Sequence, residues 1–157
     1  MFRRMRKVNK LLTKQDAEAI LDRNTNGVLA VHGDDGYPYA VPLSYVYAEG
    51  RIFFHGAVEG HKMDAILRND KVSFCVVDHD DIAPEEFNTY FASVIVFGRA
   101  RILERDEEKQ AGLEFIVRKY SPDYFEKGLD YIKATWDRVN MFEIVIEHMT
   151  GKSAVRQ

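Results

Sequence analysis

The sequence predicts an α+β fold dominated by β-structure, a small six-stranded antiparallel β-barrel with peripheral helices. Two observations predict the barrel. The predicted strands are joined by short turns, and helices are expected only before the first strand, once in the middle of the chain and late in the chain, so strands and helices do not alternate. A third observation is size. With 157 residues, 46% of them apolar, the chain suits a single domain with one hydrophobic core.

The first element is a helix that begins after Thr13. The Thr13 hydroxyl can accept a hydrogen bond from the backbone amide of Asp16, and the Asp16 carboxylate can reach back. We expect the helix to end near Asn24, because Asn26-Gly27 offers the left-handed conformations that end helices. Residues 1–10 precede it as a basic arm, which we interpret as solvated or wrapped around a second subunit.

Three strands rich in β-branched and aromatic residues are expected next: Val28–His32, Tyr37–Tyr47 and Arg51–His55. Asp35-Gly36 marks a tight hairpin between the first two, because both central positions of such a turn adopt positive φ. Pro38 and Pro42 cannot donate to a strand ladder. Part of the second strand must therefore lie at a sheet edge or beside something other than a strand, such as a ligand.

The remaining elements follow from spacing and breakers. The pattern turns helical after Gly60 and returns to strand over Lys71–Val77. We expect a loop over His79–Asn88, which is acidic and contains a proline, and a long strand over Tyr90–Leu103 with a bulge at Gly98. Two further helices, a closing strand and a polar tail are predicted at Asp106–Tyr120, Tyr124–Trp136, Asn140–Glu147 and 150–157.

Composition argues against several classes of protein. A net charge of −3 and a pI near 6.0 do not favour nucleic-acid binding. Cys75, the only cysteine, cannot form an internal disulfide, which suits a reducing compartment. No run approaches the roughly 18 apolar residues of a membrane helix, and the arginine-rich start lacks the apolar stretch of a signal peptide. We therefore expect a cytoplasmic protein without a membrane partner.

Several segments resemble motifs of enzymes or metal sites but lack residues that those motifs require. Gly151-Lys152-Ser153 copies the end of a phosphate-binding loop but lacks its upstream glycine. The five histidines have no zinc spacing, and the acidic run Asp78–Asp81 lacks the glycine and glutamate of a calcium loop. No Gly-x-Ser-x-Gly elbow is present. We predict no metal site and no covalent hydrolase.

The segment Phe54–Lys62 remains as a candidate binding site. It joins a strand to a short helix through Gly56 and Gly60, and places the unpaired amides of a helix start beside His61 and Lys62. Such a terminus favours an anion, which predicts a phosphate site. The alternative is that Gly60 only turns the chain and Lys62 is solvated, and the residues alone do not decide between the two.

Six blocks in order resemble the nitroimidazole-resistance branch of the pyridoxamine-phosphate-oxidase-like flavoproteins. They are Phe2–Arg6, Asp34–Tyr47, Phe53–Lys62, Val72–Val77, Tyr90–Ala100 and His148–Lys152. The resemblance spans residues 2 to 152. It implies one FMN-binding split-barrel domain over residues 1–157, assembled as a homodimer with FMN at the interface.

The resemblance also implies where the cofactor binds. In the family one strand lies along the isoalloxazine ring of FMN. The residues that match this strand are Val41, Pro42, Leu43 and Ser44. Residues matching His61 and Lys62 look like the phosphate clamp, and we add Ala57 and Gly60 to the cofactor-binding residues. Some relatives carry arginine where His61 stands, which would leave Lys62 as the only permanent charge on the phosphate.

His55 resembles the catalytic histidine of the family, close to the flavin, where a neutral imidazole could donate a proton or polarise a substrate. The alternative is a buried strand histidine bonded to a carbonyl. Tyr90, Ser93 and Val94 match a segment that packs near the flavin from the other subunit. Strand alternation puts Val94, Val96 and Gly98 on one face and Ser93, Ile95 and Phe97 on the other. Trp136 either stacks on the flavin or substrate, or belongs to the core.

These expectations lead to an FMN-dependent oxidoreductase that reduces small acceptors such as nitroaromatics. A second hypothesis is a flavin or haem carrier without turnover, with His55 or His61 as an axial ligand. The third is a pyridoxamine-phosphate oxidase. It is the least favoured, because Lys152 and Arg156 alone are a thin basic cluster for a second phosphate.

Overall fold

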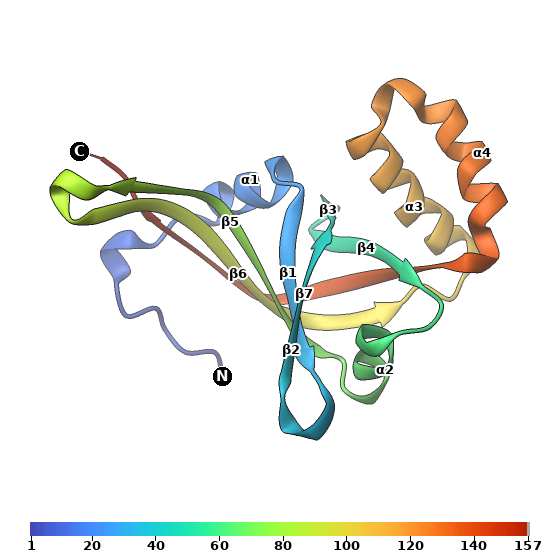
Figure 1. Cartoon of the computed structure of the whole chain (residues 1–157), viewed down its shortest axis with the longest axis horizontal. Coiled ribbons are helices and arrows are strands. Elements are labelled where there is room, and N and C mark those ends of the chain that lie inside the picture. The colour runs from blue at the N-terminus through green and yellow to red at the C-terminus, as the bar shows by residue number, and fades with distance from the viewer. Residues whose placement is uncertain (157) are drawn as a thin grey trace.

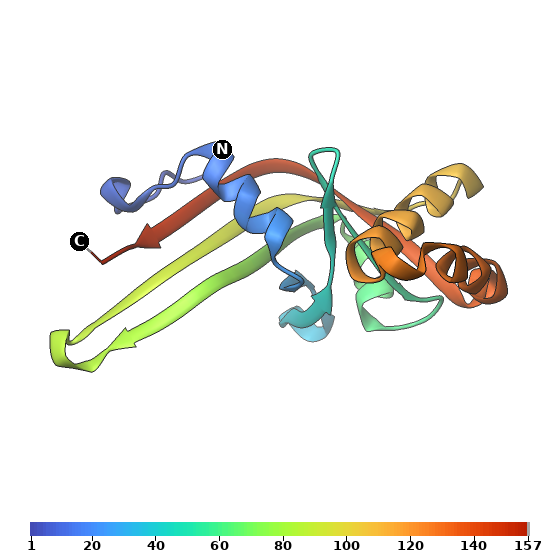
Figure 2. The same cartoon turned by 90° about the horizontal axis from the view of Figure 1, so that it is seen from above.

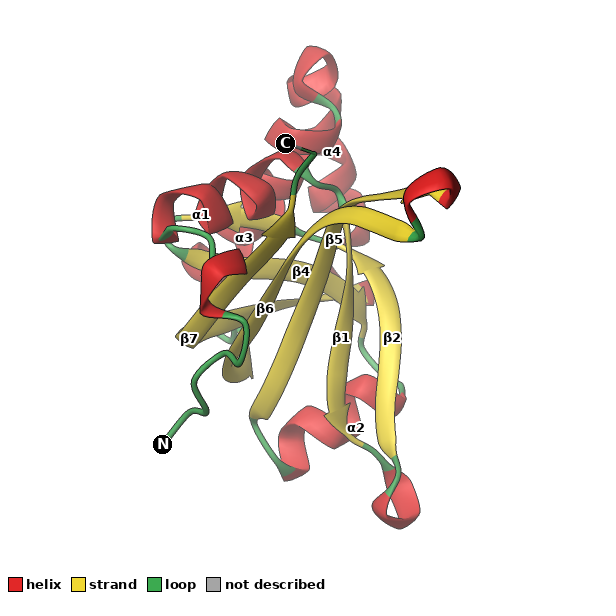
Figure 3. Cartoon of the chain, turned by 90° about the vertical axis from the view of Figure 1, so that its left-hand side faces the viewer, coloured by secondary structure: helices red, strands yellow, loops and turns green. Residues whose placement is uncertain are grey.

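The computed structural model describes residues 1–156 and consists of one antiparallel sheet with four α-helices. The sheet has seven strands in the order β2-β1-β5-β6-β7-β4-β3 and bends into an open barrel with β2 and β3 at its edges (Figures 1 and 3). The strands are β1 (Asn26–His32), β2 (Pro38–Ser44), β3 (Val46–Ala48), β4 (Arg51–Ala57), β5 (Lys71–Ala83), β6 (Asn88–Ile102) and β7 (Val139–Ala154). The helices are α1 (Lys14–Arg23), α2 (His61–Arg68), α3 (Asp106–Tyr120) and α4 (Phe125–Thr135). The predicted α+β class is confirmed.

Local signals in the sequence predicted several element ends correctly. The Thr13 hydroxyl accepts from the Asp16 amide at 3.1 Å and donates to the Asp16 carboxylate at 2.7 Å, so α1 begins as expected. Asp35 and Gly36 adopt φ values of 55° and 79° in the turn before β2. The β6–β7 register shifts beside Gly98, where a Cβ would lie 2.3 Å from the Val145 carbonyl oxygen. The predicted bulge is confirmed.

The predicted strand count was wrong by one, because the strand expected over Tyr37–Tyr47 is divided at Tyr45. The Tyr45 side chain turns fully into the core, where its hydroxyl donates to the Leu21 carbonyl at 2.6 Å. Its backbone leaves the ladder and binds Tyr120 instead. The Tyr45 amide donates to the Tyr120 hydroxyl at 3.1 Å, and that hydroxyl donates to the Tyr45 carbonyl at 2.6 Å.

Two other predicted boundaries were also wrong. The loop expected over His79–Asn88 is mostly strand, because β5 and β6 stay paired from Lys71↔Arg99 to Ala83↔Asn88 around a single-turn helix at Pro84–Glu86. This hairpin projects beyond the barrel (Figures 1 and 2). The polar tail is also strand, since β7 pairs with β6 as far as Ala154. In both segments backbone pairing with β6 outweighs the polar character of the side chains; Gln157 lies outside the described residues.

The core has two parts on opposite sides of β4 and β7. The first fills the barrel and includes residues of α1 and α2, among them Ile20, Leu21 and Ile66. The second lies between the sheet and the α3–α4 pair and includes Phe53 and Met141. Within residues 1–156 no helix is long and apolar enough to cross a membrane.

The convex side of β1, β5, β6 and β7, here called the outer face, carries apolar side chains that are not covered by a helix. The predicted alternation along β6 is confirmed: Val94 is fully buried, whereas Ile95 and Phe97 are 43% and 40% exposed on the outer face. Cys75, paired with Ile95, is half-buried there rather than in the core. The N-terminal arm crosses this face, and Phe2 stacks on the Phe97 ring at 5.5 Å.

Removing the Tyr120 hydroxyl should loosen the junction between β2 and β3. Tyr120→Phe leaves the Tyr45 amide and carbonyl without this partner, so we expect a loss of about 1–2 kcal/mol in the free energy of unfolding by urea titration. Tyr131→Phe is the matched control, since Tyr131 is 70% exposed, and should change stability by less than about 0.5 kcal/mol. Equal effects of the two substitutions would contradict this role.

Candidate functional site

The segment between β4 and α2 forms the candidate site. Gly60 adopts φ 145° immediately before α2, a conformation that favours glycine, and its carbonyl accepts from the Asp64 amide at 3.1 Å. The amides of His61, Lys62 and Met63 belong to the first turn and have no partner within the helix. They lie at the positive end of the helix dipole, where an anion is stabilised.

The Lys62 side chain packs on the backbone of Gly56 in β4. A Cβ at Gly56 would lie 2.9 Å from Lys62 Cε, 3.1 Å from Lys62 Nζ and 3.1 Å from the Phe142 ring. Only glycine leaves room for this arrangement. Within residues 1–156 no carboxylate lies within 4 Å of the Lys62 ammonium. The Lys62 ammonium is therefore held against β4 without a counter-ion among the described residues.

His61 completes the start of α2. Its ring stacks on Tyr39 of β2, with centroids 4.1 Å apart. Its Nε2 atom is buried and has no hydrogen-bond partner among the described residues; Asp34 Oδ2 lies 3.6 Å away, while Arg68 binds Asp34 Oδ1 at 2.8 Å. Buried polar atoms nearly always have a partner. The Nε2 atom is therefore open to a ligand or a water molecule.

His55 lies beside this cluster on β4. Strand alternation turns it away from the face on which Gly56 meets Lys62, toward the side of its register partner Met141. The ring is partly exposed and forms no hydrogen bond to a carbonyl within residues 1–156, which argues against the buried structural role. Reduced solvation, and secondly the positive charge of Lys62, lower the pKa of His55 below 6.5. The imidazole is therefore neutral at pH 7.

The predicted ring-binding strand lies at the sheet edge, as its prolines required. Pro42 and Ser44 are exposed, whereas Val41 and Leu43 turn toward the first core and are half-buried. Ala57 is exposed where β4 ends. Tyr39 shares its face with Val41, so the edge of β2 and the start of α2 are adjacent in one chain.

The three predicted residues of β6 are not brought to α2 within one chain. Ser93 pairs with Lys152, near the far end of β7, whereas β4 pairs with Val139–Val145. Tyr90 lies farther out on the projecting hairpin. The Val94 side chain is fully buried, so a contact from this position would have to come from the backbone. Within one chain Tyr90 and Ser93 therefore lie away from the start of α2.

Sequence reasoning missed two residues near the site, Tyr39 and Asp34. The structure also answers the question left open about Trp136. Tyr39 and Asp34 meet His61 only through the β1–β2 hairpin, and no local pattern marks that contact. Trp136 packs in the second core with the Lys109 ammonium 4.3 Å above its ring, which favours the core interpretation.

A hollow of about 550 Å³ lies elsewhere, between the start of β6 and the end of β7. Its arginine, Arg156, is already paired with Glu85 and Glu86 at 3.0 and 3.1 Å. The Arg156 guanidinium is therefore less available to a ligand than the Lys62 ammonium at the start of α2. Among the described residues no group of three or more metal-binding side chains is close enough to hold an ion.

Comparison with solved structures supports the fold. A candidate 5-nitroimidazole antibiotic resistance protein from Bacteroides thetaiotaomicron has a TM-score of 0.75 at 23% identity, over 91% of this chain and 86% of that one. A flavocytochrome from Azotobacter vinelandii has a TM-score of 0.81 at 19% identity, over 98% and 73% of the two chains. An FAD-binding protein from Mesorhizobium loti has a TM-score of 0.64 at 25% identity, over 93% and 98%.

Among curated proteins no sequence matches this chain. The sequence profile of the pyridoxamine 5'-phosphate oxidase family, however, matches residues 13–153, which include β4 and α2 and reach the last residue but one of β7. The chain therefore belongs to the pyridoxamine 5'-phosphate oxidase family.

Proposed function

We propose that this protein is an FMN-dependent oxidoreductase that reduces small acceptors such as nitroaromatic compounds. The observation that carries the proposal is the cation-bearing start of α2, where Lys62 lies on Gly56 without a counter-ion. The FMN phosphate would accept hydrogen bonds from the first amides of α2 and from Lys62. The buried Nε2 of His61, which has no hydrogen-bond partner among the described residues, is consistent with such a ligand.

The names of two structural neighbours support the same cofactor class and acceptor. One is an FAD-binding protein, and another is a candidate 5-nitroimidazole resistance protein. Bound flavin would supply the redox chemistry, accepting a hydride or two electrons and passing them on. The edge strand β2, with Val41, Pro42, Leu43 and Ser44, would hold the flat ring, because its outer side has no neighbouring strand.

His55 would act on the substrate. A neutral imidazole next to the cofactor site can donate its ring N–H to an acceptor oxygen and exchange a proton with it. The charge of Lys62 favours this neutral form. The lysine would bind the phosphate, and in the flavin-free protein its charge adds to the reduced solvation that lowers the pKa of His55.

A homodimer would complete the site. The outer face exposes Val28, Val77, Ile95 and Phe97 on one chain, and contiguous apolar surface of this kind marks an interaction site. A second copy related by a two-fold axis would cover it with the same surface. Tyr90 and Ser93 of the partner subunit would then approach the flavin ring, which they cannot do within one chain.

A carrier of flavin or haem without turnover is the second candidate, favoured by the structural likeness to a flavocytochrome. His55 or His61 would serve as the haem ligand. The absorbance spectrum of the purified protein separates the two cofactors: flavin bands near about 370 and 450 nm, or a haem band near about 400 nm.

Lys62→Ala should weaken FMN binding roughly 10- to 100-fold, since a charge-assisted hydrogen bond to phosphate contributes about 1.5–3 kcal/mol. Riboflavin, which lacks the phosphate, should bind to the variant and the native protein equally well. Flavin fluorescence titration measures both affinities. Lys14→Ala on α1, whose side chain is 81% exposed, is the control and should change neither. A parallel loss for both ligands would rule out a phosphate contact.

The His55 imidazole should titrate below pH 6.5 in the flavin-free protein, so that less than half is protonated at that pH. Lys62→Ala removes a like charge and should raise the His55 pKa, whereas Lys62→Arg keeps the charge and should leave it low. The shift of the His55 ring signals with pH, followed by NMR, gives both values. A His55 pKa that Lys62→Ala leaves unchanged would contradict the electrostatic coupling.

The FMN-loaded protein should be reduced anaerobically by NADH or NADPH faster than free FMN is, and a nitroimidazole should reoxidise it. His55→Gln should lower the reoxidation rate about 100-fold, the usual contribution of a positioned proton donor, without changing FMN affinity. His32→Gln, at an exposed histidine of β1, is the control. Reduction no faster than that of free FMN would disprove the reductase and leave the carrier.

A further inference from the structure

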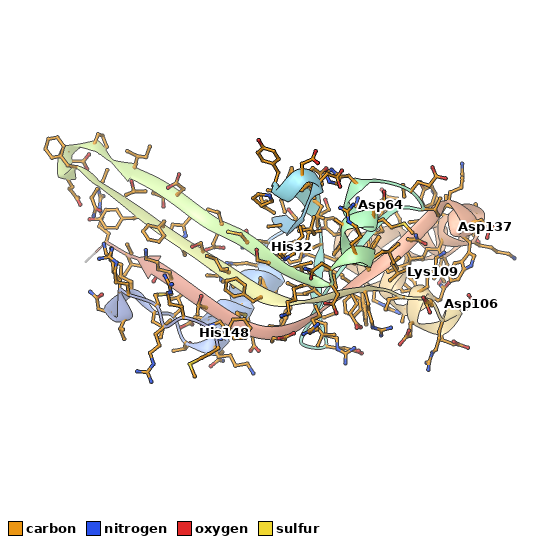
Figure 4. All side chains as sticks on the ribbon, turned by 90° about the horizontal axis from the view of Figure 1, so that it is seen from below. His32, Asp64, Asp106, Lys109, Asp137 and His148 are labelled. Carbon is orange, nitrogen blue, oxygen red and sulfur yellow. The ribbon has the colours of Figure 1, made fainter. Side chains whose placement is uncertain are left out.

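The turn before β2 lies against α2, and its Asp34 carboxylate approaches side chains from both ends of that helix. Arg68, in the last turn of α2, donates from Nη2 to Asp34 Oδ1 at 2.8 Å, and Asp34 Oδ2 lies 3.6 Å from His61 Nε2 in the first turn. Figure 4 shows this turn beside α2, on which Asp64 is labelled. The seven residues from His61 to Arg68 (68 − 61) are close to two helical turns, which puts both side chains on one side of α2, toward Asp34.

The position of the Asp34 carboxylate is fixed by the turn as well as by Arg68. The Asp34 carbonyl accepts from the Tyr37 amide at 3.0 Å, and the Gly33 amide donates to the Tyr37 carbonyl at 2.9 Å. The backbone on both sides of Asp34 is therefore hydrogen-bonded. With Oδ1 bound by Arg68, Oδ2 is the oxygen that remains for His61.

The His61 ring is held so that its two nitrogens have different surroundings. Tyr39 of β2 stacks on the ring with centroids 4.1 Å apart, which limits its rotation. Nε2 is buried beside Asp34, whereas the side chain as a whole is 37% exposed, so solvent reaches the ring from the other side. One ring nitrogen therefore faces a carboxylate, and the other, Nδ1, is left for a ligand at the start of α2.

A neutral His61 imidazole cannot donate to two partners. It carries one N–H, so it can donate either to Asp34 or to an anion at the start of α2. An imidazolium carries two N–H groups and can donate to both. The negative charges of the Asp34 carboxylate and of a bound phosphate would both stabilise this protonated ring. Anion binding would then also give the buried Nε2 atom the hydrogen-bond partner that it lacks.

We propose that Asp34 is a positioning residue for the phosphate site: it orients His61 and supports its protonated form, so that binding of the flavin phosphate takes up one proton from solvent. This inference rests on the proposed function, because the anion is the FMN phosphate. His61 then has the role that arginine has in some relatives, as a second cation beside Lys62. Unlike arginine, it supplies the charge only while it is protonated, so the affinity for FMN should fall as the pH rises.

The other ionisable groups around His61 keep their charge between pH 7 and 8.5. They are Asp34 in the turn, Tyr39 of β2, and Lys62, Asp64 and Arg68 on α2. Groups of these types titrate below about pH 5 or above about pH 10, whereas histidine ordinarily titrates near about pH 6.5. Reduced solvation and Lys62 lower the pKa of His55 below 6.5, so that imidazole is neutral over this range. The phosphate, with a second pKa of about 6, stays a dianion. A change in FMN affinity therefore reports on His61.

The dissociation constants of FMN and riboflavin, measured by flavin fluorescence between pH 7 and 8.5, test the proposal. The native protein should bind FMN roughly tenfold more weakly at pH 8.5 than at pH 7, whereas riboflavin binding should not change. His61→Arg keeps its charge at every pH and should bind FMN with constant affinity over this range. In the FMN complex at pH 7, the nitrogen NMR signals of the native His61 ring should be those of an imidazolium.

Asp34→Asn should weaken FMN binding at pH 7 about five- to tenfold and leave riboflavin binding unchanged, because an amide does not stabilise the positive ring. It should also return His61 to the neutral form in the FMN complex, an effect that a merely structural role of Asp34 would not produce. Asp35→Asn is the matched control. Asp35 lies in the same turn with a φ of 55°, which asparagine also adopts, so this substitution should change neither affinity.

Three results would each overturn the proposal: equal FMN affinity at pH 7 and 8.5, the same pH dependence in His61→Arg, or native affinity with a protonated His61 in Asp34→Asn. These results leave the proposed function in place as long as Lys62→Ala still weakens FMN binding. A protein that does not bind FMN would disprove both.

Discussion

The contact between Lys62 and the backbone of Gly56 is the interaction on which the candidate site depends. Because Gly56 has no side chain, the lysine can lie against β4 while its own backbone forms the first turn of α2. A methyl group at Gly56 would lie 2.9 Å from Lys62 Cε, which would force the helix or the side chain to move. The missing Cβ thus lets the Lys62 side chain lie on β4, beside the first amides of α2.

The position of the sheet edge depends on the second core. Tyr120, at the end of α3, binds the backbone of Tyr45 where β2 ends, so the α3–α4 pair helps to fix the point at which the sheet divides. Tyr39 on the same strand stacks on His61 of α2. The edge of β2 is therefore held at both ends, by α3 at one and by α2 at the other. A planar ligand would meet a rigid edge rather than a loose strand.

Features encoded within a few residues could be predicted from the sequence, and features that depend on distant pairing could not. The Thr13 cap, the Asp35-Gly36 turn and the bulge at Gly98 are local, as is the bend from β4 into α2. The continuation of β5 through an acidic segment depends on β6, which pairs with it regardless of charge. The approach of Asp34 to His61 joins residues 27 positions apart (61 − 34), so only the folded chain shows it.

The buried carboxylate Glu143 and the Lys62 ammonium differ in how their charges are paired. Glu143, only 3% exposed, is bound by Arg51 at 2.8 Å and Arg101 at 3.0 Å, so the one charged group in the core is fully paired. A structural charge that lacks a partner is costly, and this chain pairs its own. Lys62 has no carboxylate within 4 Å among the described residues, as is true of several other lysines and arginines, but unlike a solvated surface charge it lies against the backbone of β4 beside the first amides of α2. An anion at this point would meet both the ammonium group and the helix amides.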